Sequence, residues 1–143
     1  MNNPTDPPFM RKPEPLLTPD DTWWMWSDSF DTRIRWATVV HESTVERDGT
    51  DPSADEVTSW SVDLIEDEAG RRFTVDHDVI LETMQRIVRC RDAIRLTDTI
   101  IDHIAAVLDA KCHEDAMDGL CQLDAIGYDA IVQIATLGQV IYG

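Results

Sequence analysis

Thiols, imidazoles and carboxylates, the side chains that hold metal ions, gather between residues 103 and 121. Asp109 and His113 are one helical turn apart, a usable spacing for two ligands of one zinc ion. The segment lacks the Cys-x-x-Cys and His-Glu-x-x-His pairs typical of zinc sites. Cys112 continues an apolar stripe and is expected in the core. We therefore expect no metal or other cofactor. The alternative is a metal or small-molecule site around His103, Cys112 and His113.

A second candidate is Asp76-His77-Asp78, where one imidazole lies between two carboxylates. Two flanking carboxylates would raise the pKa of the histidine. The alternative is a helix start, with Asp76 as N-cap and the acidic residues stabilised by the helix dipole. No nucleophile or second histidine lies nearby, so we expect the helix start.

The third candidate is an anion site formed by four of the twelve basic residues, Arg86, Arg89, Arg91 and Arg95. Such a cluster could bind a phosphate or a carboxylate. Cations near a helix C-terminus also stabilise the helix, and Glu82 is placed to pair with Arg86 across one turn. We expect the helix-stabilising role, with anion binding as the alternative.

The terminal segment predicts a largely buried helix between Asp124 as N-cap and Gly138 as a left-handed end. Its clearly polar residues form one stripe, Asp129, Gln133 and Thr136. The stripe either lines a pocket or is the solvated edge of the helix, and we expect the solvated edge. Residues 140–142 then read as a short extended tail that returns to the core.

Trp23, Trp24 and Trp26 fall within four residues near the start of the predicted fold. Aromatic side chains carry large buried area, so we expect a helix or arm packed on the core. An exposed patch that docks a partner protein is the alternative.

Periodicity predicts the elements that position these residues. Alternating patterns predict strands over 33–46, 57–67 and 72–75, and helical patterns begin near residues 77, 97 and 125. A polar link is expected over 113–122. Residues 1–21 form a Pro-rich lead that we expect to be a disordered arm. The sequence thus predicts one α+β domain over 22–143, a three-stranded antiparallel meander packed by about three helices.

The net charge of the chain narrows the classes of binding partner. Twenty-eight acidic residues oppose twelve basic ones, giving a net charge of −16 that is spread along the chain. This charge repels nucleic acid and anionic membranes and favours basic protein surfaces. The odd number of cysteines, Cys90, Cys112 and Cys121, is typical of reduced thiols in a cytoplasm. The sequence contains no Ser-His-Asp arrangement and no Gly-rich phosphate loop, so no motif supports an enzymatic function.

The C-terminal residues resemble a signature of small proteins encoded by phages and mobile elements, many of them actinobacterial. The likeness rests on Asp124-Ala125, Asp129 and Gln133, on the run from Ala135 to Gly143, and on Trp36 upstream. The chain departs at 31–33, where relatives often have paired Gly, and at 136–138, where they have Leu-Phe-Gly. The resemblance implies a genomic setting and a fold, and it transfers no catalytic residue.

Together these observations predict an acidic accessory protein of a phage or mobile element in the host cytoplasm. It would bind a host or phage protein with a basic surface, through its charge and its tryptophans. A sharper form is mimicry of nucleic-acid charge. The alternative is a small-molecule- or metal-binding protein or enzyme that uses the arginine cluster or the His103 region.

Overall fold

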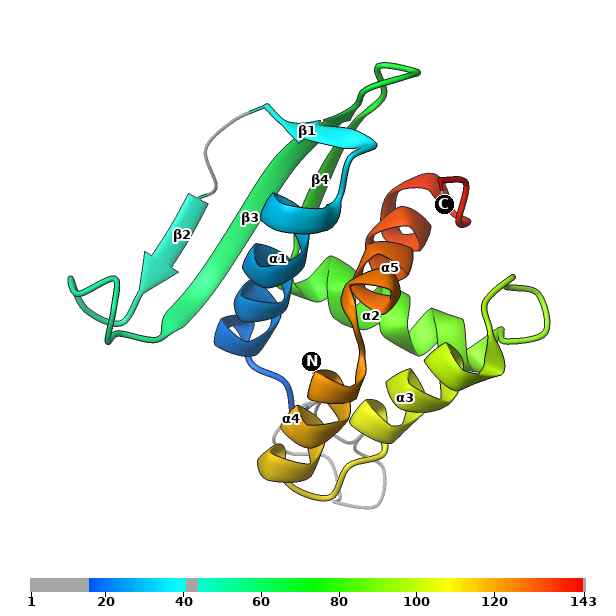
Figure 1. Cartoon of the computed structure of the whole chain (residues 1–143). Helices are drawn as coiled ribbons and strands as arrows, with labels where there is room; N and C mark the ends of the chain where they lie inside the picture. Colours follow the sequence, from blue (N-terminus) through cyan, green and yellow to red (C-terminus); the bar gives the residue numbers. More distant parts are fainter. Residues whose placement is uncertain (1–15, 41–43, 143) are drawn as a thin grey trace, which may run out of the picture.

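The computed structural model describes residues 16–40 and 44–142 and has an α+β fold (Figure 1). The predicted class is therefore confirmed, with more elements than expected. The elements follow in the order α1 (Pro19–Arg33), β1 (Ala37–Val39), β2 (Thr44–Arg47), β3 (Val57–Glu66), β4 (Arg72–Asp76), α2 (His77–Arg89), α3 (Asp98–Leu108), α4 (His113–Gln122) and α5 (Ala125–Leu137).

The sheet is antiparallel and built around β3, which pairs with each of the other strands. Ser61 of β3 pairs with both β2 and β4, and Leu64 pairs with both β1 and β4. A strand has only two edges, so β1 and β2 must share the edge opposite β4.

The single strand predicted over 33–46 is wrong, because two short strands occupy this edge. From Val39 to Thr44 the chain advances five residues, whereas β3 advances three residues between their partners Leu64 and Ser61. The pairing register therefore does not continue unbroken from β1 to β2. Residues 41–43 lie outside the described residues.

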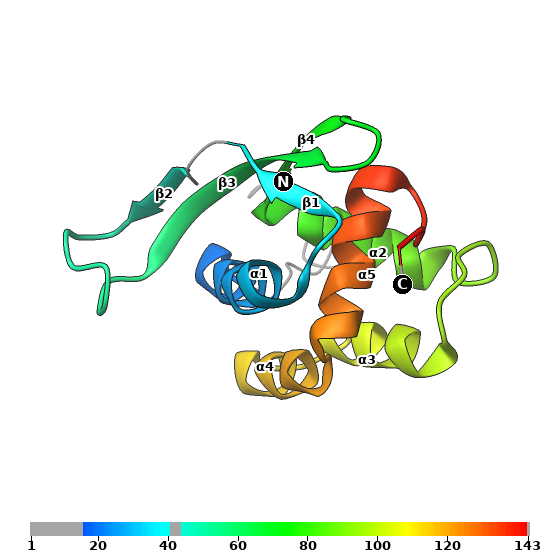
Figure 2. The same ribbon diagram turned by 45° about the horizontal axis from the view of Figure 1, so that its top comes forward.

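The sheet has one covered face and one face toward solvent. Along β3 the side chains of Trp60, Val62 and Leu64 are buried, whereas the alternating residues Ser61 and Asp63 are partly exposed. Figure 2 shows the strands on one side of the molecule, α1, α2 and α5 beneath them, and α3 and α4 farthest from the sheet. The predicted wet face of the meander is confirmed.

Local capping explains where several helices begin and end. Asp76 accepts a hydrogen bond from Val79 N at 2.9 Å, and Asp124 accepts one from Gly127 N at 3.0 Å. Gly138 ends α5 with a φ of 80°, a conformation that favours glycine. These predicted boundaries are confirmed. Among the described helices none combines the length and apolarity needed to cross a bilayer.

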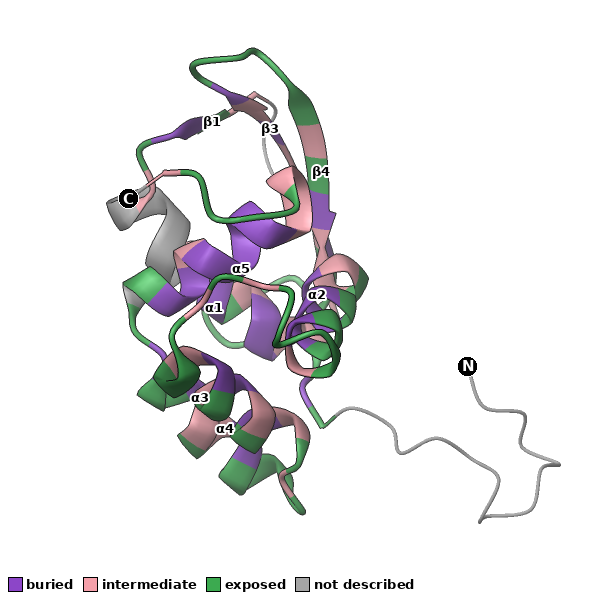
Figure 3. Cartoon of the chain, turned by 90° about the vertical axis from the view of Figure 1, so that its right-hand side faces the viewer, coloured by how far each residue is buried: buried purple, intermediate pink, exposed green. Residues whose placement is uncertain are grey.

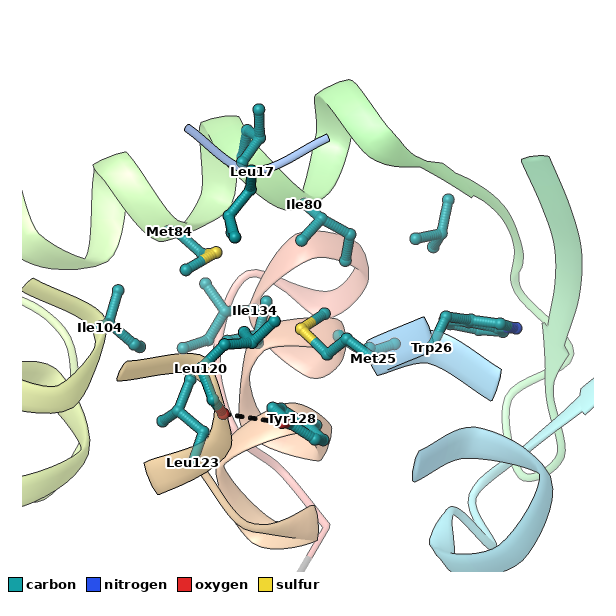
Figure 4. Close-up of a cluster of buried hydrophobic side chains, with 14 of the residues drawn as sticks. Leu17, Met25, Trp26, Ile80, Met84, Ile104, Leu120, Leu123, Tyr128 and Ile134 are labelled. Atoms are coloured by element: carbon teal, nitrogen blue, oxygen red, sulfur yellow. Dashed lines mark hydrogen bonds between the residues drawn. The ribbon is translucent and has the colours of Figure 1, made fainter. Parts of the chain in front are cut away.

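The core lies between the sheet and the outer helices (Figure 3). Figure 4 shows that the side chains of Met25, Met84, Ile104, Leu120 and Ile134, which belong to α1, α2, α3, α4 and α5 in that order, meet there. The Tyr128 hydroxyl donates to the Leu120 carbonyl at 2.8 Å. Fully buried members include Met25, Ile80, Met84, Ile104, Leu120, Ile131 and Ile134.

Two predicted boundaries need correction. The arm predicted over 1–21 is too long, because Leu17 is buried and Thr18 and Asp21 form a capping box at the start of α1. Residues 1–15 lie outside the described residues. The polar link predicted over 113–122 is the helix α4, which buries Ala116 and Leu120. Only these two residues of α4, four positions apart, are buried, so the sequence shows too few apolar positions to reveal the helical period.

Candidate functional site

A pocket of about 430 Å³ opens where the end of α1, the start of β1, the β3–β4 turn, α5 and the C-terminal tail meet. Its volume lies in the range of ligand pockets, about 300–1,000 Å³. It combines carboxylates, one guanidinium and two aromatic rings from distant parts of the sequence. The lining residues are Ile34, Arg35, Trp36, Asp67, Glu68, Asp129 and Tyr142.

Trp36 connects three of these elements. Its carbonyl accepts a hydrogen bond from Asp67 N at 2.8 Å, beside the first pair of β1 and β3. Its indole Nε1 donates to Asp129 Oδ1 at 2.7 Å. Its ring stacks on Tyr142, with centroids 5.8 Å apart and planes 6° from parallel. The indole therefore fixes α5 and the tail against the sheet edge.

Gln133 holds the tail in place from the middle of α5. Its Oε1 accepts from Ile141 N and Tyr142 N at 2.8 and 2.9 Å. Its Nε2 donates to Tyr142 O at 2.9 Å and to Asp129 Oδ2 at 2.8 Å. A side-chain amide offers two donors and two acceptor sites, and all four are occupied. The buried amide thus supplies the tail with the bonds a neighbouring strand would give.

A buried carboxylate lies behind the aromatic pair. Glu66 is 1% exposed, and Arg71 binds it through Nε at 2.6 Å and Nη2 at 3.0 Å. The Tyr142 hydroxyl donates to the same carboxylate at 2.6 Å. The bond from Arg71, followed by that from Tyr142, lowers the pKa of Glu66. The bond to Glu66, with burial, raises the pKa of Tyr142 to about 12.

The β3–β4 turn presents the outer carboxylates of the pocket. Glu66 N donates to Arg71 O, and Gly70 N donates to Glu66 O, both at 2.8 Å. Gly70 has a φ of 72°, which this tight turn requires. Asp67 and Glu68 are exposed at the tip, and Thr38 Oγ1 donates to Asp67 Oδ1 at 2.6 Å.

The pocket lining has three kinds of chemical group, namely carboxylates, a guanidinium and aromatic rings. Its residues offer carboxylate acceptors and aromatic surface, and they include no imidazole, thiol or amine. Every buried side-chain nitrogen or oxygen of the described residues has a hydrogen-bond partner. Because its lining contains three carboxylates, the pocket is suited to holding a cationic group.

The polar stripe of α5 is covered, contrary to the expected solvated edge. Gln133 is fully buried, and Asp129 and Thr136 are partly buried. Trp36 and the returning tail pack over the stripe, and Thr136 Oγ1 donates to Val132 O at 2.8 Å. The expectation failed because these covering residues come from other parts of the fold.

The tryptophan-rich segment belongs mainly to the core. Trp26 is 2% exposed, and Trp23 and Trp26 lie 5.7 and 6.0 Å from Trp60 between ring centroids. Trp24 is 42% exposed on the outer side of α1. The expected packing is confirmed for two of the three, and the alternative docking patch reduces to Trp24.

The four arginines do not share one site. Arg86 donates to Ile134 O at 2.9 Å, near the C-terminus of α5, and forms no ion pair with Glu82 among the described residues. Arg91 binds the exposed Asp98 and Asp102 of α3. Arg89 and Arg95 are exposed. The intrahelical pair predicted for Arg86 is wrong, because the carbonyl of α5 lies within reach.

The region around His103 forms no group of three metal-ligating side chains within the described parts of the chain. Cys112 is exposed and precedes α4, so its predicted core position is wrong. His113 Nε2 lies 2.8 Å from Asp21 Oδ2 and ties α4 to the start of α1.

The segment Asp76-His77-Asp78 is the helix start that its sequence predicts. His77 Nδ1 lies 2.8 Å from Thr22 Oγ1, which also accepts from Trp60 Nε1 at 2.9 Å. Burial lowers the pKa of His77 and outweighs the opposing charges of Asp78 and Asp76. The imidazole thus joins α2 to α1.

Sequence reasoning missed most of the pocket. The predicted strands over 33–46 and 57–67 contain Arg35 and Asp67, and Glu68 follows the second strand, but no pattern gives these three residues a functional role. Two signals existed, because Trp36 and Tyr142 belong to the residues on which the resemblance rests. Those residues, with Asp129 and Gln133, converge on this one site.

Comparisons of the chain with protein-family models, with curated proteins and with solved structures found no match.

Proposed function

We propose that this protein binds another protein whose surface is basic, as an accessory factor of a phage or mobile element in the host cytoplasm. The genomic setting rests on the resemblance of the C-terminal residues. The mode of action rests on the physical chemistry of the surface. Acidic side chains favour encounter with a basic partner and speed its association.

The observation that carries the proposal is how few carboxylates are neutralised within the molecule. Among the described residues, only Asp21, Glu66, Asp98 and Asp102 lie within 4.0 Å of a basic side chain. Other carboxylates are exposed over several elements, including Glu46, Asp48, Glu56, Asp67, Glu68, Asp109, Glu114, Asp115 and Asp118. This surface is available to an external cationic partner.

A specific form of the proposal is mimicry of nucleic-acid charge. A protein with 28 acidic residues and a net charge of −16 can occupy the basic site of a DNA-binding protein. Nucleic acid would then compete with this protein for the same partner. Competition separates mimicry from binding at an unrelated basic surface.

The test is capture of partners from host lysate at low and high salt, with three variants that each neutralise one face. The first combines Glu114→Gln, Asp115→Asn and Asp118→Asn on α4. The second combines Glu46→Gln, Asp48→Asn and Glu56→Gln around β2. The third combines Asp67→Asn and Glu68→Gln. Circular dichroism confirms that each variant is folded.

We expect to capture one basic partner that is released at high salt. At least one of the three variants should bind this partner more weakly. Added duplex DNA should displace it if the protein mimics nucleic acid. Absence of any partner at low salt would contradict the proposal. Retention that is indifferent to salt and to all three variants would contradict it equally.

A further inference from the structure

The pocket carries an excess of negative charge. Its lining contains the carboxylates of Asp67, Glu68 and Asp129 and one opposing guanidinium, that of Arg35. Three acidic groups against one basic group leave two negative charges around a volume of about 430 Å³. Negative charge gathered in a concave site attracts a cation more strongly than the same charge on a flat surface.

Two of these carboxylates are held in place but not saturated. Asp129 accepts one bond on each oxygen, from Trp36 Nε1 and from Gln133 Nε2. Asp67 accepts one from Thr38 on Oδ1. Since an ionised carboxylate accepts about four hydrogen bonds, both retain acceptor sites. The existing bonds orient the carboxylates before any ligand arrives, which lowers the entropy lost on binding.

The aromatic side chains of the pocket favour a planar cation. Trp36 and Tyr142 stack nearly parallel, 6° apart, and both line the site. A guanidinium group stacks on aromatic surfaces and donates in a planar fork to carboxylates, whereas an ammonium group is a strongly hydrated point charge. The Tyr142 hydroxyl donates to Glu66, and a phenol is protonated at neutral pH even at its ordinary pKa of about 10.

We propose that this pocket binds the guanidinium group of an arginine side chain presented by a protein partner. The inference rests on the proposed function for the source of the arginine, and it names the side chain that is recognised. Asp67, Glu68 and Asp129 accept from the guanidinium, and its plane packs on the outer face of one ring of the stacked pair. Arg35, an exposed residue of the lining, is a competing cation.

The test is a titration of the full chain with N-acetyl-arginine amide, followed by NMR. The reporters are the indole N–H of Trp36 and the backbone amides of Asp67 and Glu68. We expect saturable shifts that weaken as salt rises. The neutral isostere N-acetyl-citrulline amide should give none, and N-acetyl-lysine amide should bind more weakly.

Variants identify the groups responsible. Asp67→Asn and Glu68→Gln should each weaken binding of the arginine probe by about two- to fivefold, as expected for loss of an exposed charge pair. Arg35→Gln should strengthen binding, because it removes the competing cation. Asp92→Asn, an exposed carboxylate between α2 and α3 and outside the pocket lining, is the matched control and should leave the affinity unchanged.

Three results would overturn the inference: no saturable shift at low salt, equal binding of the citrulline or lysine probe, or partner capture unaffected by Asp67→Asn with Glu68→Gln. Each leaves the proposed function standing if a basic partner is still captured through another acidic face. Conversely, a saturable arginine site without any captured partner would contradict the proposed function alone.

Discussion

Gln133 shows how one side chain can hold a chain end. Its amide bonds the backbone of Ile141 and Tyr142 and the carboxylate of Asp129, and it is fully buried. Tyr142 is thereby presented to Trp36 and Glu66. The pocket wall therefore depends on a residue that does not line it.

Replacing Gln133 by glutamate tests this role at constant size. Gln133→Glu places a second oxygen where Nε2 now donates to Tyr142 O and Asp129 Oδ2, so acceptors face acceptors. We expect the free energy of unfolding to fall by about 2–4 kcal/mol, measured by urea denaturation. The exposed Gln85→Glu is the control and should stay within about 0.5 kcal/mol of the parent. Equal stability of the two variants would refute the tail-holding role.

His77 makes a prediction about pH. Burial lowers its pKa below the ordinary 6.5, against the charges of Asp78, Asp76 and Asp21. The folded state therefore favours the neutral imidazole, and its stabilising effect is complete above pH 6.5 and is lost as the pH falls toward the lower, folded-state value.

We expect the free energy of unfolding to decline with acidification below pH 6.5, and His77→Asn to reduce that decline. Chemical denaturation at a series of pH values measures both. Parallel curves for the parent and the variant would show that this imidazole does not contribute.

At the scale of elements, α3 and α4 lie close together at Gly119. A Cβ at this position would lie 2.9 Å from Val107 Cγ2 and 3.3 Å from Val107 N. Backbone cannot yield as a flexible side chain does. The close approach explains why a glycine stands within a helix, where it lowers helix propensity.

The substitution Gly119→Ala has two opposite effects on stability. Alanine favours the helix by about 1 kcal/mol, and the contact with Val107 costs about 1–3 kcal/mol through displaced packing. Because the nearest atoms include backbone atoms of Val107, we expect the free energy of unfolding to fall by about 1 kcal/mol, measured by thermal unfolding. Asp118→Ala, an exposed neighbour on α4, should be nearly neutral. A stabilised Gly119→Ala would mean that the helices separate easily.

At the scale of the whole molecule, the net charge of −16 is a source of self-repulsion as well as of recognition. The described ion pairs relieve little of it, since Arg91 is the only arginine that bridges two acidic residues among them. Screening of exposed carboxylates should therefore stabilise the folded state.

We expect the midpoint of thermal unfolding to rise by about 2–4 °C between about 0.05 and 0.5 M sodium chloride. The triple neutralisation on α4, Glu114→Gln with Asp115→Asn and Asp118→Asn, should show a smaller rise. A midpoint that falls with salt would indicate that attractive pairs dominate the surface.

What the sequence determined by itself is local. The caps at Asp76 and Asp124 join residues three apart, and Gly138 ends a helix through its own φ. Alternation along β3 selected the buried Trp60, Val62 and Leu64, because a strand has a side-chain period of two. Such features depend on neighbours in the chain and are readable from it.

Only the tertiary structure decided which polar residues are covered and which meet. The bond from Trp36 to Asp129 spans 93 residues, and that from Tyr142 to Glu66 spans 76. No periodic pattern encodes such pairs. Arg86 likewise binds a carbonyl of α5 rather than its helical neighbour. The sequence thus specified β3, β4, α2, α3 and α5. Packing of α5 and its tail against the sheet edge created the pocket, because burial and hydrogen bonding there depend on residues brought together by folding.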